Sequence, residues 1–318
     1  MKHILFIDPL DKLVPKKDSS LMLALTLKMM GIETYLLFEP NLFFTNKEPE
    51  NLKVFPFEGN FKEGSFYIDS FELKNPLYTS LEKGDFIHMR IDPPFDTRYL
   101  RYLWILGIFE RRGVHVLNSP KGILNNNEKL TAYEGQFSHP SFVGQDKDAF
   151  ISFIKKKVEE GVKDFIFKPL DLYQGLGIEK ASFQDIDQIN ETFNRKVEEC
   201  GGPIVVQPFD VKVESGEVRS LFFNCEEMGT ILKVPPKGEF LANIAQGASY
   251  KKYELNSSLK NICEDITFSL KKEGVYFVAF DIIGDCISEV NITCPGLMVE
   301  VSEACEENLA QKIVLNYN

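Results

Sequence analysis

The sequence predicts a mixed α/β and α+β protein in which a parallel sheet near the N-terminus is followed by smaller mixed units. Two observations lead to this fold class. Residues 3–7 and 32–38 are compact apolar runs typical of strands, and residues 19–30 between them have helical spacing that ends at Gly31. From residue 142 onward, short helical and strand-like segments alternate. A strand, a helix and a second strand in this order predict a βαβ unit of a parallel sheet.

The chain has 318 residues, more than one ordinary hydrophobic core accommodates. Strand-like runs at 85–89 and 114–117 flank a helical segment at 97–112, and they complete a predicted first domain over residues 1–120. Within it, residues 41–81 mix polar and aromatic residues with Gly and Pro, which favours short strands around a turn. We expect a small α+β unit over 121–203 and a C-terminal unit over 204–318.

The second half of the chain supplies the elements of those two units. The small unit is expected to contain helices at 147–160 and 185–199 and a strand at 165–168. The C-terminal unit is expected to contain one helix and five strands, at 259–273 and at 204–207, 218–223, 230–234, 276–283 and 286–291.

Composition excludes several classes of function. The net charge of -11 repels nucleic acid and anionic lipid, so neither is expected as a partner. The six cysteines have no CxxC spacing, which argues against a zinc site or a disulfide scaffold and favours free thiols in the cytoplasm. The apolar run near the N-terminus is too short for a signal peptide or a membrane span and is broken by Asp8 and Pro9. A protein this acidic that handled a nucleotide would have to gather its cations locally or use a metal.

The segment FDIIGDCISEVNIT, residues 280–293, is the most informative one. Asp281, Glu289 and Asn291 place oxygen atoms on two predicted strands joined by a Gly-Asp turn. Glu289 and Asn291 are two residues apart and share a face, and Asp281 can lie across from them. Such oxygens suit a hard cation that bridges phosphates. The alternative is an acidic, exposed hairpin face, but the flanking residues are apolar, as in a buried strand.

Three further segments could contact a nucleotide. Lys168 ends a predicted strand before a loop with two glycines, where an ammonium and backbone amides can approach phosphate, although many lysines at strand ends are only solvated. Lys129 opens a predicted helix behind a polar run that can cap it; otherwise Asn127, Glu128 and Lys129 would be surface residues. Residues 205–210 form an apolar strand running into a Pro kink, which could read adenine or could be an ordinary edge strand.

Together these segments resemble the bacterial glutathione synthetase family of the ATP-grasp superfamily, over nearly the whole chain. The matching motifs are KKDSS at 16–20, MRIDPPFDTRYL at 89–100, NEKL at 127–130, FKPLD at 167–171, FDIIGD at 280–285 and EVNIT at 289–293. The resemblance implies an ATP-grasp fold with an N-terminal Rossmann-like parallel-sheet domain.

The resemblance also implies a role for each matching residue. Phosphates of ATP would contact Lys129 and Lys168, adenine would lie at Gln207 and Phe209, and Glu217 would hold the ribose. Magnesium, which Mn²⁺ could replace, would be held by Asp281, Glu289 and Asn291. The catalytic side chains would be Arg219, Lys233 and Asn243, and the peptide-substrate side would be lined by Asp18, Ser20 and Arg90.

The implied reaction is ATP-dependent joining of γ-glutamylcysteine to glycine. The donor carboxylate takes the γ-phosphate of ATP, ADP leaves, and the amine of glycine then displaces phosphate from the acyl-phosphate. No side-chain nucleophile is needed, but water must be excluded, so we expect a closing loop at 235–249. The family also implies a homo-oligomer, either a dimer or a tetramer.

The sequence departs from the family pattern at three places. Leu241 or Ala242 stands where the closing loop of the family has an arginine, and Lys233 replaces another arginine, which exchanges a planar fork for a point charge. Cys294 and Gly296 alter the family's Thr-Ser-Pro-Thr motif. Two alternatives therefore stay open: a ligase with a different donor or acceptor, and a nucleotide-binding homologue with weakened catalysis.

Overall fold

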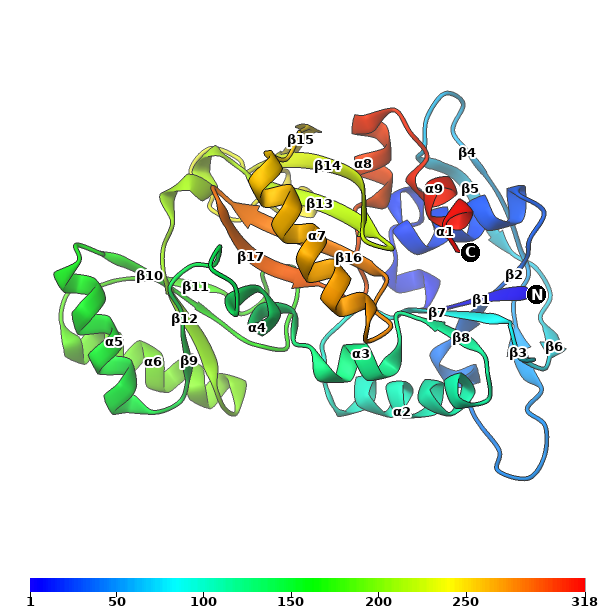
Figure 1. The fold of residues 1–318 in the computed structure, drawn as a ribbon, viewed down its shortest axis with the longest axis horizontal. Coiled ribbons are helices and arrows are strands. Elements are labelled where there is room, and N and C mark those ends of the chain that lie inside the picture. The colour runs from blue at the N-terminus through cyan, green and yellow to red at the C-terminus, as the bar shows by residue number, and fades with distance from the viewer. Residues whose placement is uncertain (318) are drawn as a thin grey trace.

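The N-terminal unit of the chain is built on a parallel sheet. The structure is a computed structural model that describes residues 1–317, and its three sheet-based units lie in a row (Figure 1). The sheet has the order β2-β1-β7-β8, and the helices α1 and α2 pack on opposite faces. These elements are β1 (Lys2–Ile7), α1 (Ser19–Met29), β2 (Glu33–Phe38), β7 (Phe86–Arg90), α2 (Thr97–Arg111) and β8 (His115–Leu117). The predicted parallel sheet is therefore confirmed.

Two short antiparallel ladders fill residues 52–79, as the mixed composition there predicted. One pairs β3 (Leu52–Val54) with β6 (Leu77–Thr79), and the other pairs β4 (Phe57–Phe61) with β5 (Ile68–Leu73). Gly59 on β4 lies so close to the neighbouring strand that an added Cβ would come within 2.5 Å of a backbone oxygen. A side chain at this position would force the two strands apart.

The second unit is a four-stranded sheet of order β11-β10-β12-β9, whose hydrogen-bonded pairs are all antiparallel. It contains β9 (Phe142–Gly144), α5 (Lys147–Glu159), β10 (Asp164–Lys168), β11 (Glu179–Ser182), α6 (Ile186–Cys200) and β12 (Ile204–Pro208). Both helices pack through a cluster of phenylalanine side chains. The predicted limit after residue 203 falls just before β12, which pairs in this sheet. The three-unit division remains a proposal, in which the second limit is better placed after Pro208.

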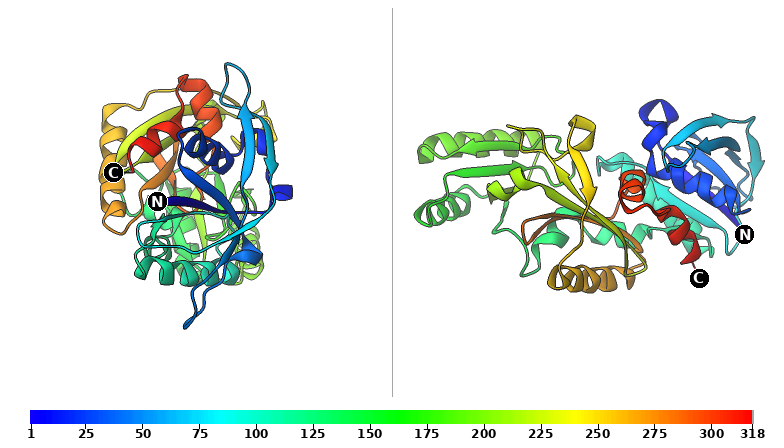
Figure 2. Two further views of the ribbon diagram at one scale, coloured as in Figure 1. Left: turned by 90° about the vertical axis from the view of Figure 1, so that its right-hand side faces the viewer. Right: turned by 90° about the horizontal axis from the view of Figure 1, so that it is seen from above.

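The third unit is a five-stranded antiparallel sheet of order β15-β14-β13-β16-β17. One face is covered by α7, and the other packs against α1, α8 and α9 of the shared core (Figures 1 and 2). Its elements are β13 (Glu217–Phe223), β14 (Glu226–Val234), β15 (Ser249–Lys252), α7 (Ser257–Lys271), β16 (Phe277–Ile283), β17 (Cys286–Asn291), α8 (Met298–Cys305) and α9 (Leu309–Leu315). The helix predicted at 259–273 begins two residues earlier because Asn256 caps it, accepting from the Leu259 amide.

Residues between the first and third units tie them together. Asn118, just after β8, is buried and makes four hydrogen bonds to the third unit. Its amide donates to the carbonyls of Phe277 and Ile292, and its oxygen accepts from the amides of Tyr276 and Phe277. The short helices α3 (Pro120–Asn125) and α4 (Glu128–Tyr133) follow. This junction fixes the carboxyl edge of the parallel sheet against β16 and β17.

None of the helices in residues 1–317 is both long enough and apolar enough to cross a lipid bilayer.

Candidate active site

A cavity of about 500 Å³ is lined by residues from all three units. The parallel sheet contributes residues after β1 and at the end of β7, the second unit contributes β10 and β12, and the third contributes β13, β14, β16 and β17. Every site residue that the sequence predicted lines this cavity, namely Asp18, Ser20, Arg90, Lys129, Lys168, Gln207, Phe209, Glu217, Arg219, Lys233, Asn243, Asp281, Glu289 and Asn291. The fold therefore brings together residues that are up to 273 positions apart, from 18 to 291.

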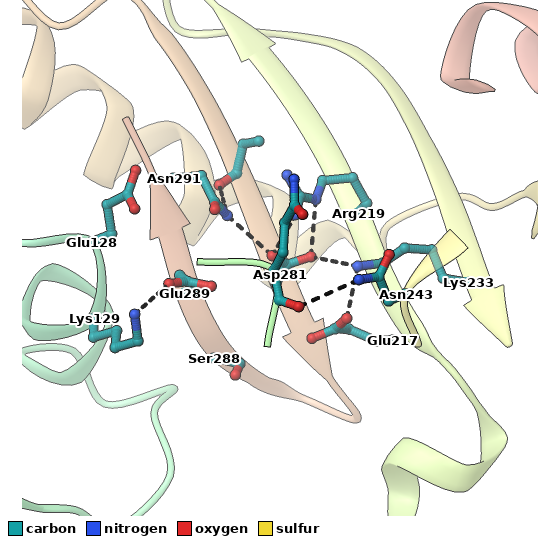
Figure 3. A network of polar contacts seen from close by, with 12 residues as sticks. Glu128, Lys129, Glu217, Arg219, Lys233, Asn243, Asp281, Ser288, Glu289 and Asn291 are labelled. Atoms are coloured by element: carbon teal, nitrogen blue, oxygen red, sulfur yellow. Dashed lines mark hydrogen bonds and ion pairs between the residues drawn. The ribbon is translucent and has the colours of Figure 1, made fainter. Parts of the chain in front are cut away.

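The three predicted metal ligands lie together on two neighbouring strands. Asp281 on β16 is directly opposite Glu289 on β17 in the ladder, and Asn291 follows two residues later. The Asn291 amide nitrogen lies 3.0 Å from the nearer Asp281 carboxylate oxygen and donates to it (Figure 3). The hairpin geometry expected from the sequence is thus present.

Two cations from neighbouring strands hold Asp281. Arg219 on β13, which is opposite Asp281 in the ladder, donates from Nε and Nη2 to the two carboxylate oxygens at 2.9 and 2.7 Å. Lys233 on β14 donates to the same carboxylate at 2.9 Å (Figure 3). Burial opposes ionisation, but Arg219 and Lys233 outweigh it and lower the pKa of Asp281 to about 2. Asp281 is therefore a carboxylate at neutral pH.

Lys233 also pairs with Glu217, at 2.7 Å. The resemblance implied a catalytic role for Lys233 and a contact with the ribose for Glu217. Burial raises the pKa of Glu217, Lys233 opposes this, and the nearby Asp281 adds to the rise. Of the two carboxylates that contact Lys233, Asp281 is held in its ionised form. Glu217 is protonated more easily and is the one more available to bind a ligand.

Lys129 faces the metal ligands from α4. Its Nζ lies 3.0 Å from Glu289 and 2.9 Å from the carbonyl oxygen of Leu172. Asn127 caps the helix by accepting from the Lys129 and Leu130 amides, so the polar run before Lys129 acts as the sequence predicted. The ammonium is therefore presented at the cavity wall by a capped helix.

Glu128, which the sequence suggested could be a surface residue, instead anchors α4. Its Oε1 accepts from the amides of Ile292 and Thr293 and from the Thr293 hydroxyl, at 2.7 to 2.9 Å. These bonds fix the end of β17 against the helix that carries Lys129. Glu128 is a positioning residue for the ion pair of Lys129 and Glu289.

Lys168 ends β10 and points to the same region. Burial lowers the pKa of Lys168, and the charge of Glu289 opposes this most strongly. Its Nζ lies 3.4 Å from the Ser288 hydroxyl. Lys233, by comparison, donates hydrogen bonds to two carboxylates, those of Glu217 and Asp281. Lys168 is therefore placed where its ammonium could contact a phosphate group in the cavity.

The predicted adenine site is only partly available to a base. Gln207 on β12 is buried, and its amide nitrogen donates to the Ser141 hydroxyl at 2.7 Å. The Phe209 amide donates to the Asp164 carbonyl at 2.8 Å, so of the Phe209 backbone groups only the carbonyl could contact a base. The Phe209 ring is covered by Lys180, whose Nζ lies 3.7 Å from the ring centroid.

The predicted peptide-substrate residues form the opposite end of the cavity. Asp18 caps α1 by accepting from the Leu21 amide at 2.8 Å, and burial raises the pKa of Asp18 to about 6. Arg90 is buried, and it donates from Nε to the Ser20 hydroxyl at 3.0 Å and from Nη2 to the Pro295 carbonyl at 2.8 Å. Ser20 and Arg90 thus support each other at the cavity wall.

The predicted closing loop meets the glycine loop that follows β10. Asn243 lies 3.3 Å from the Gln174 carbonyl and donates to it. Leu241 packs on Gly175, so closely that a Cβ added there would lie 3.2 Å from the leucine side chain. Gly175 has φ +80, a backbone conformation that glycine adopts without strain. This loop therefore makes an apolar contact at the cavity, through one of the two residues, Leu241 or Ala242, at which the resemblance places an arginine.

The site also contains residues that the sequence did not single out as functional. Cys294, noted only as a departure from the family pattern, lines the cavity, and burial raises the pKa of its thiol, which makes it a poor nucleophile. Glu300 in the first turn of α8 lines the cavity and is 1% exposed. The sequence feature that could have identified Glu300 as a buried site residue is its position as an acidic residue inside an apolar run, LMVEV, residues 297–301.

The donor set on β16 and β17 fits magnesium. It consists of two carboxylates and one amide, which are hard oxygen donors, and all three line the cavity that Lys129 and Lys168 share. Within residues 1–317 no cluster of three or more His, Cys, Asp and Glu side chains is arranged to hold a metal ion, and the predicted set includes Asn291 as its third ligand. The remaining ligands of an octahedral Mg²⁺ would come from phosphate oxygens and water.

Two antiparallel sheets face each other across a cavity that is lined by Asp281, Glu289, Asn291 and converging lysines, an arrangement typical of an ATP-grasp ligase. Sequence comparison identifies the family. The model of the prokaryotic glutathione synthetase N-terminal domain matches residues 1–123, and that of the prokaryotic glutathione synthetase ATP-grasp domain matches residues 128–306. The chain belongs to the prokaryotic glutathione synthetase family, whose members are ATP-dependent ligases.

Full-length relatives agree with this assignment. The chain is 29% identical to the glutathione synthetase of Parasynechococcus marenigrum, over 99% of this chain and 98% of that protein. It is 30% identical to the glutathione synthetase of Nitrosomonas europaea, over 98% of this chain and 95% of that protein. The family resemblance inferred from the motifs is therefore confirmed.

Solved structures share the fold at low sequence identity. D-cycloserine synthetase DcsG has a TM-score of 0.66 at 12% identity, covering 99% of this chain and all of that one. The macrocyclase MdnC of Microcystis aeruginosa has a TM-score of 0.64 at 11% identity, covering 99% of both chains. These likenesses confirm the predicted ATP-grasp fold.

Proposed function

We propose that the protein joins γ-glutamylcysteine to glycine in a Mg²⁺- and ATP-dependent reaction. The observation that carries this proposal is the convergence of the predicted metal, phosphate and peptide residues on one cavity, in a chain of the glutathione synthetase family. We infer that Asp281, Glu289 and Asn291 hold Mg²⁺, which would offset negative charge on the phosphate oxygens. Mn²⁺ has the same preference for oxygen ligands and could substitute.

The other residues of the cavity have proposed roles that follow from their positions. Lys129 forms an ion pair with Glu289, and the charge of Glu289 also acts on Lys168, which suits contact of both lysines with the β- and γ-phosphates. Arg219 is paired with Asp281 and would contact the transferred phosphoryl group, and Lys233 also holds Asp281. Asn243 in the closing loop would complete the catalytic side. The nucleoside would lie toward Gln207, Phe209 and Glu217, and the donor toward Asp18, Ser20 and Arg90.

The proposed reaction has two steps, phosphoryl transfer and then amide formation. The donor carboxylate oxygen attacks the γ-phosphorus, the bond to the bridging oxygen breaks, and ADP leaves. The free amine of the acceptor then attacks the acyl carbon, inorganic phosphate leaves, and the amine nitrogen loses a proton. The residues of the chain bind and orient the substrates and neutralise negative charge on the phosphate groups. The loop containing Leu241 and Asn243 excludes water from the acyl-phosphate.

One observation favours a second candidate function within the same chemistry. The apolar contact of Leu241 with Gly175 stands where the family pattern places an arginine that could bind an acceptor carboxylate. A ligase for a different amine would account for this change. A nucleotide-binding protein with weakened catalysis is the other alternative, and the intact metal ligands weigh against it.

Release of ADP and phosphate tests these alternatives. The protein is incubated with MgATP and γ-glutamylcysteine, with glycine in one arm and other amino acids and amines in parallel arms. We expect turnover with glycine to exceed that with every other acceptor. Turnover only with another amine would identify the second candidate. MgATP binding by calorimetry without phosphate release from any combination would favour the nucleotide-binding protein.

The cellular setting of the protein is also proposed. We infer a cytoplasmic enzyme, because thiol substrates and the free cysteines of the described residues suit a reducing compartment. We also infer a dimer or tetramer, by analogy with the family.

A further inference from the structure

Glu300 is a buried carboxylate that the proposed reaction does not yet use. It lies in the first turn of α8, is 1% exposed and lines the cavity beside Asp18. Among residues 1–317, nothing donates a hydrogen bond to its Oε2 atom. Burying an acceptor without a partner is costly, so this oxygen requires an explanation.

The surroundings of Glu300 explain why α8 holds it there. The Ser19 hydroxyl, at the start of α1, accepts from the Met298 amide at 3.0 Å and so joins the first turns of the two helices. The positive ends of both helices stabilise an anion in this region. A purely structural role, in which Glu300 only neutralises the helix ends, would leave Oε2 unpaired in the same way and must be separated by experiment.

The charges around Glu300 have a pattern that matches one end of a substrate. Burial raises the pKa of Glu300, and the charges of Lys17 and Asp18, just before α1, and of Arg219 on β13 also act on its carboxylate. A buried carboxylate with a lysine charge acting on it complements a zwitterion, which has one ammonium and one carboxylate. Under the proposed function, the donor has such a group: the α-amino acid head of its γ-glutamyl residue.

We propose that Glu300 binds the α-ammonium of the γ-glutamyl head of the donor, with Oε2 as acceptor. This inference rests on the proposed function and deepens it. The acceptor amine is excluded as the ligand because it must be unprotonated to attack the acyl carbon. The donor ammonium does not react and can remain charged throughout, so an ion pair with Glu300 would hold the distal end of the donor while its carboxylate reacts.

The test compares two donors in two proteins. One donor is γ-glutamylcysteine, and the other is glutarylcysteine, which lacks only the α-ammonium. We expect the wild-type enzyme to prefer γ-glutamylcysteine in kcat/KM by about 10- to 100-fold, the range for a hydrogen bond to a charged group. In Glu300→Gln this preference should collapse toward one, mainly through the KM for the donor, while the KM for ATP stays unchanged.

Two further variants make the result specific. Glu303→Gln is the matched control, because Glu303 lies one turn later on α8, accepts from Ser65 and Phe66, and does not line the cavity. It should keep the wild-type preference. Glu300→Asp keeps the negative charge and should keep most of the preference for γ-glutamylcysteine. It replaces Glu300→Gln as the test variant if Glu300→Gln does not fold.

Each outcome decides the matter. An equal loss of kcat/KM for both donors in Glu300→Gln would show that Glu300 only positions α8. This result would overturn the inference and leave the proposed function intact. An unchanged preference in Glu300→Gln, its loss in Glu300→Asp, or no wild-type preference would overturn the inference as well. A wild-type enzyme that turns over neither donor with glycine would overturn the proposed function and this inference with it.

Discussion

At the residue scale, Glu289 can be changed without endangering the fold. Its side chain is 24% exposed, whereas that of Asp281 is 6% exposed and paired with two cations. Because Gln is isosteric but uncharged, Glu289→Gln should reduce kcat at least about 100-fold, as loss of a metal ligand exceeds loss of its outer partners. The unfolding transition should be unchanged. Steady-state kinetics and thermal melts check this, and full activity would remove Glu289 from the metal site.

Asp281 should behave differently, because it neutralises Arg219 and Lys233. Asp281→Asn leaves Arg219 without its carboxylate partner and Lys233 with Glu217 alone, so the free energy of unfolding should fall by about 3–5 kcal/mol. Asp285→Asn is the matched control, since Asp285 lies in the turn of the same hairpin with a side chain 73% exposed. Denaturant titrations at neutral pH measure both variants. A loss below 1 kcal/mol for Asp281→Asn would contradict the ion network.

The lowered pKa of Asp281 also predicts a pH dependence. Its folded pKa, about 2, lies below the ordinary value of 3.8, so its stabilisation is present above pH 3.8 and is lost as pH falls toward 2. The wild-type protein should therefore lose stability over this window more steeply than Asp281→Asn. Unfolding midpoints in denaturant at several acid pH values give the two slopes, and identical slopes would contradict the assignment.

At the element scale, Asp18 has a structural role and a proposed binding role that can be separated. As the N-cap of α1 it should stabilise the protein by about 1 kcal/mol, which Asp18→Ala loses and Asp18→Asn retains. Both variants should raise the donor KM if the charge is needed. Melting curves and donor kinetics on the pair distinguish the roles; an unchanged KM in Asp18→Asn would confine Asp18 to capping.

The raised pKa of Asp18 gives a second readout for the same element. Burial raises this pKa from 3.8 to about 6, so the folded protein binds the proton more tightly, and ionised Asp18 is available only above about pH 6. The donor KM of the wild type should rise as pH falls through 6, and this rise should be smaller in Asp18→Asn. Matching pH profiles for the two proteins would contradict the prediction.

The sequence predicted elements well where one physical signal was strong. The strands β16 and β17 were identified because apolar runs flank Asp281 and Glu289, and a Gly-Asp turn joins them. The strand β15 was missed because SYKK is a polar edge strand without an apolar face. The helix α8 was missed because Leu297, in a left-handed conformation, precedes it in place of a capping side chain. The burial of Glu300 followed from that packing and could not be predicted locally.

At the scale of the whole molecule, Asn118 connects the parallel sheet to β16. Asn118→Ala would leave buried amides and carbonyls of the third unit unpaired, so we expect a loss of roughly 2–5 kcal/mol, with each unpaired group costing about 1–3 kcal/mol. Asn126→Ala is the control, because its side chain bonds only locally, to the Gly122 carbonyl. Differential scanning calorimetry measures both. Equal melting temperatures in the two variants would contradict this account of the junction.

The arrangement of the three units could be predicted only through the family resemblance. Periodicity predicts a strand or a helix, but it does not show that β12 joins β10 or that α8 and α9 pack against α1. Those contacts depend on long-range packing, which single segments do not encode. The motifs identified the residues of the site, and the structure supplied their partners, such as Lys233 for Glu217 and Glu128 for the end of β17.

The central claim is that Asp281, Glu289 and Asn291 hold a divalent ion that binds the triphosphate beside Lys168. A crystal structure with a nonhydrolysable ATP analogue and Mg²⁺ tests this most directly. The account predicts a metal ion within coordination distance of all three side chains, with the β- and γ-phosphates contacting Lys129 and Lys168. A nucleotide bound elsewhere, or a metal ion held without Asp281 and Glu289, would contradict it.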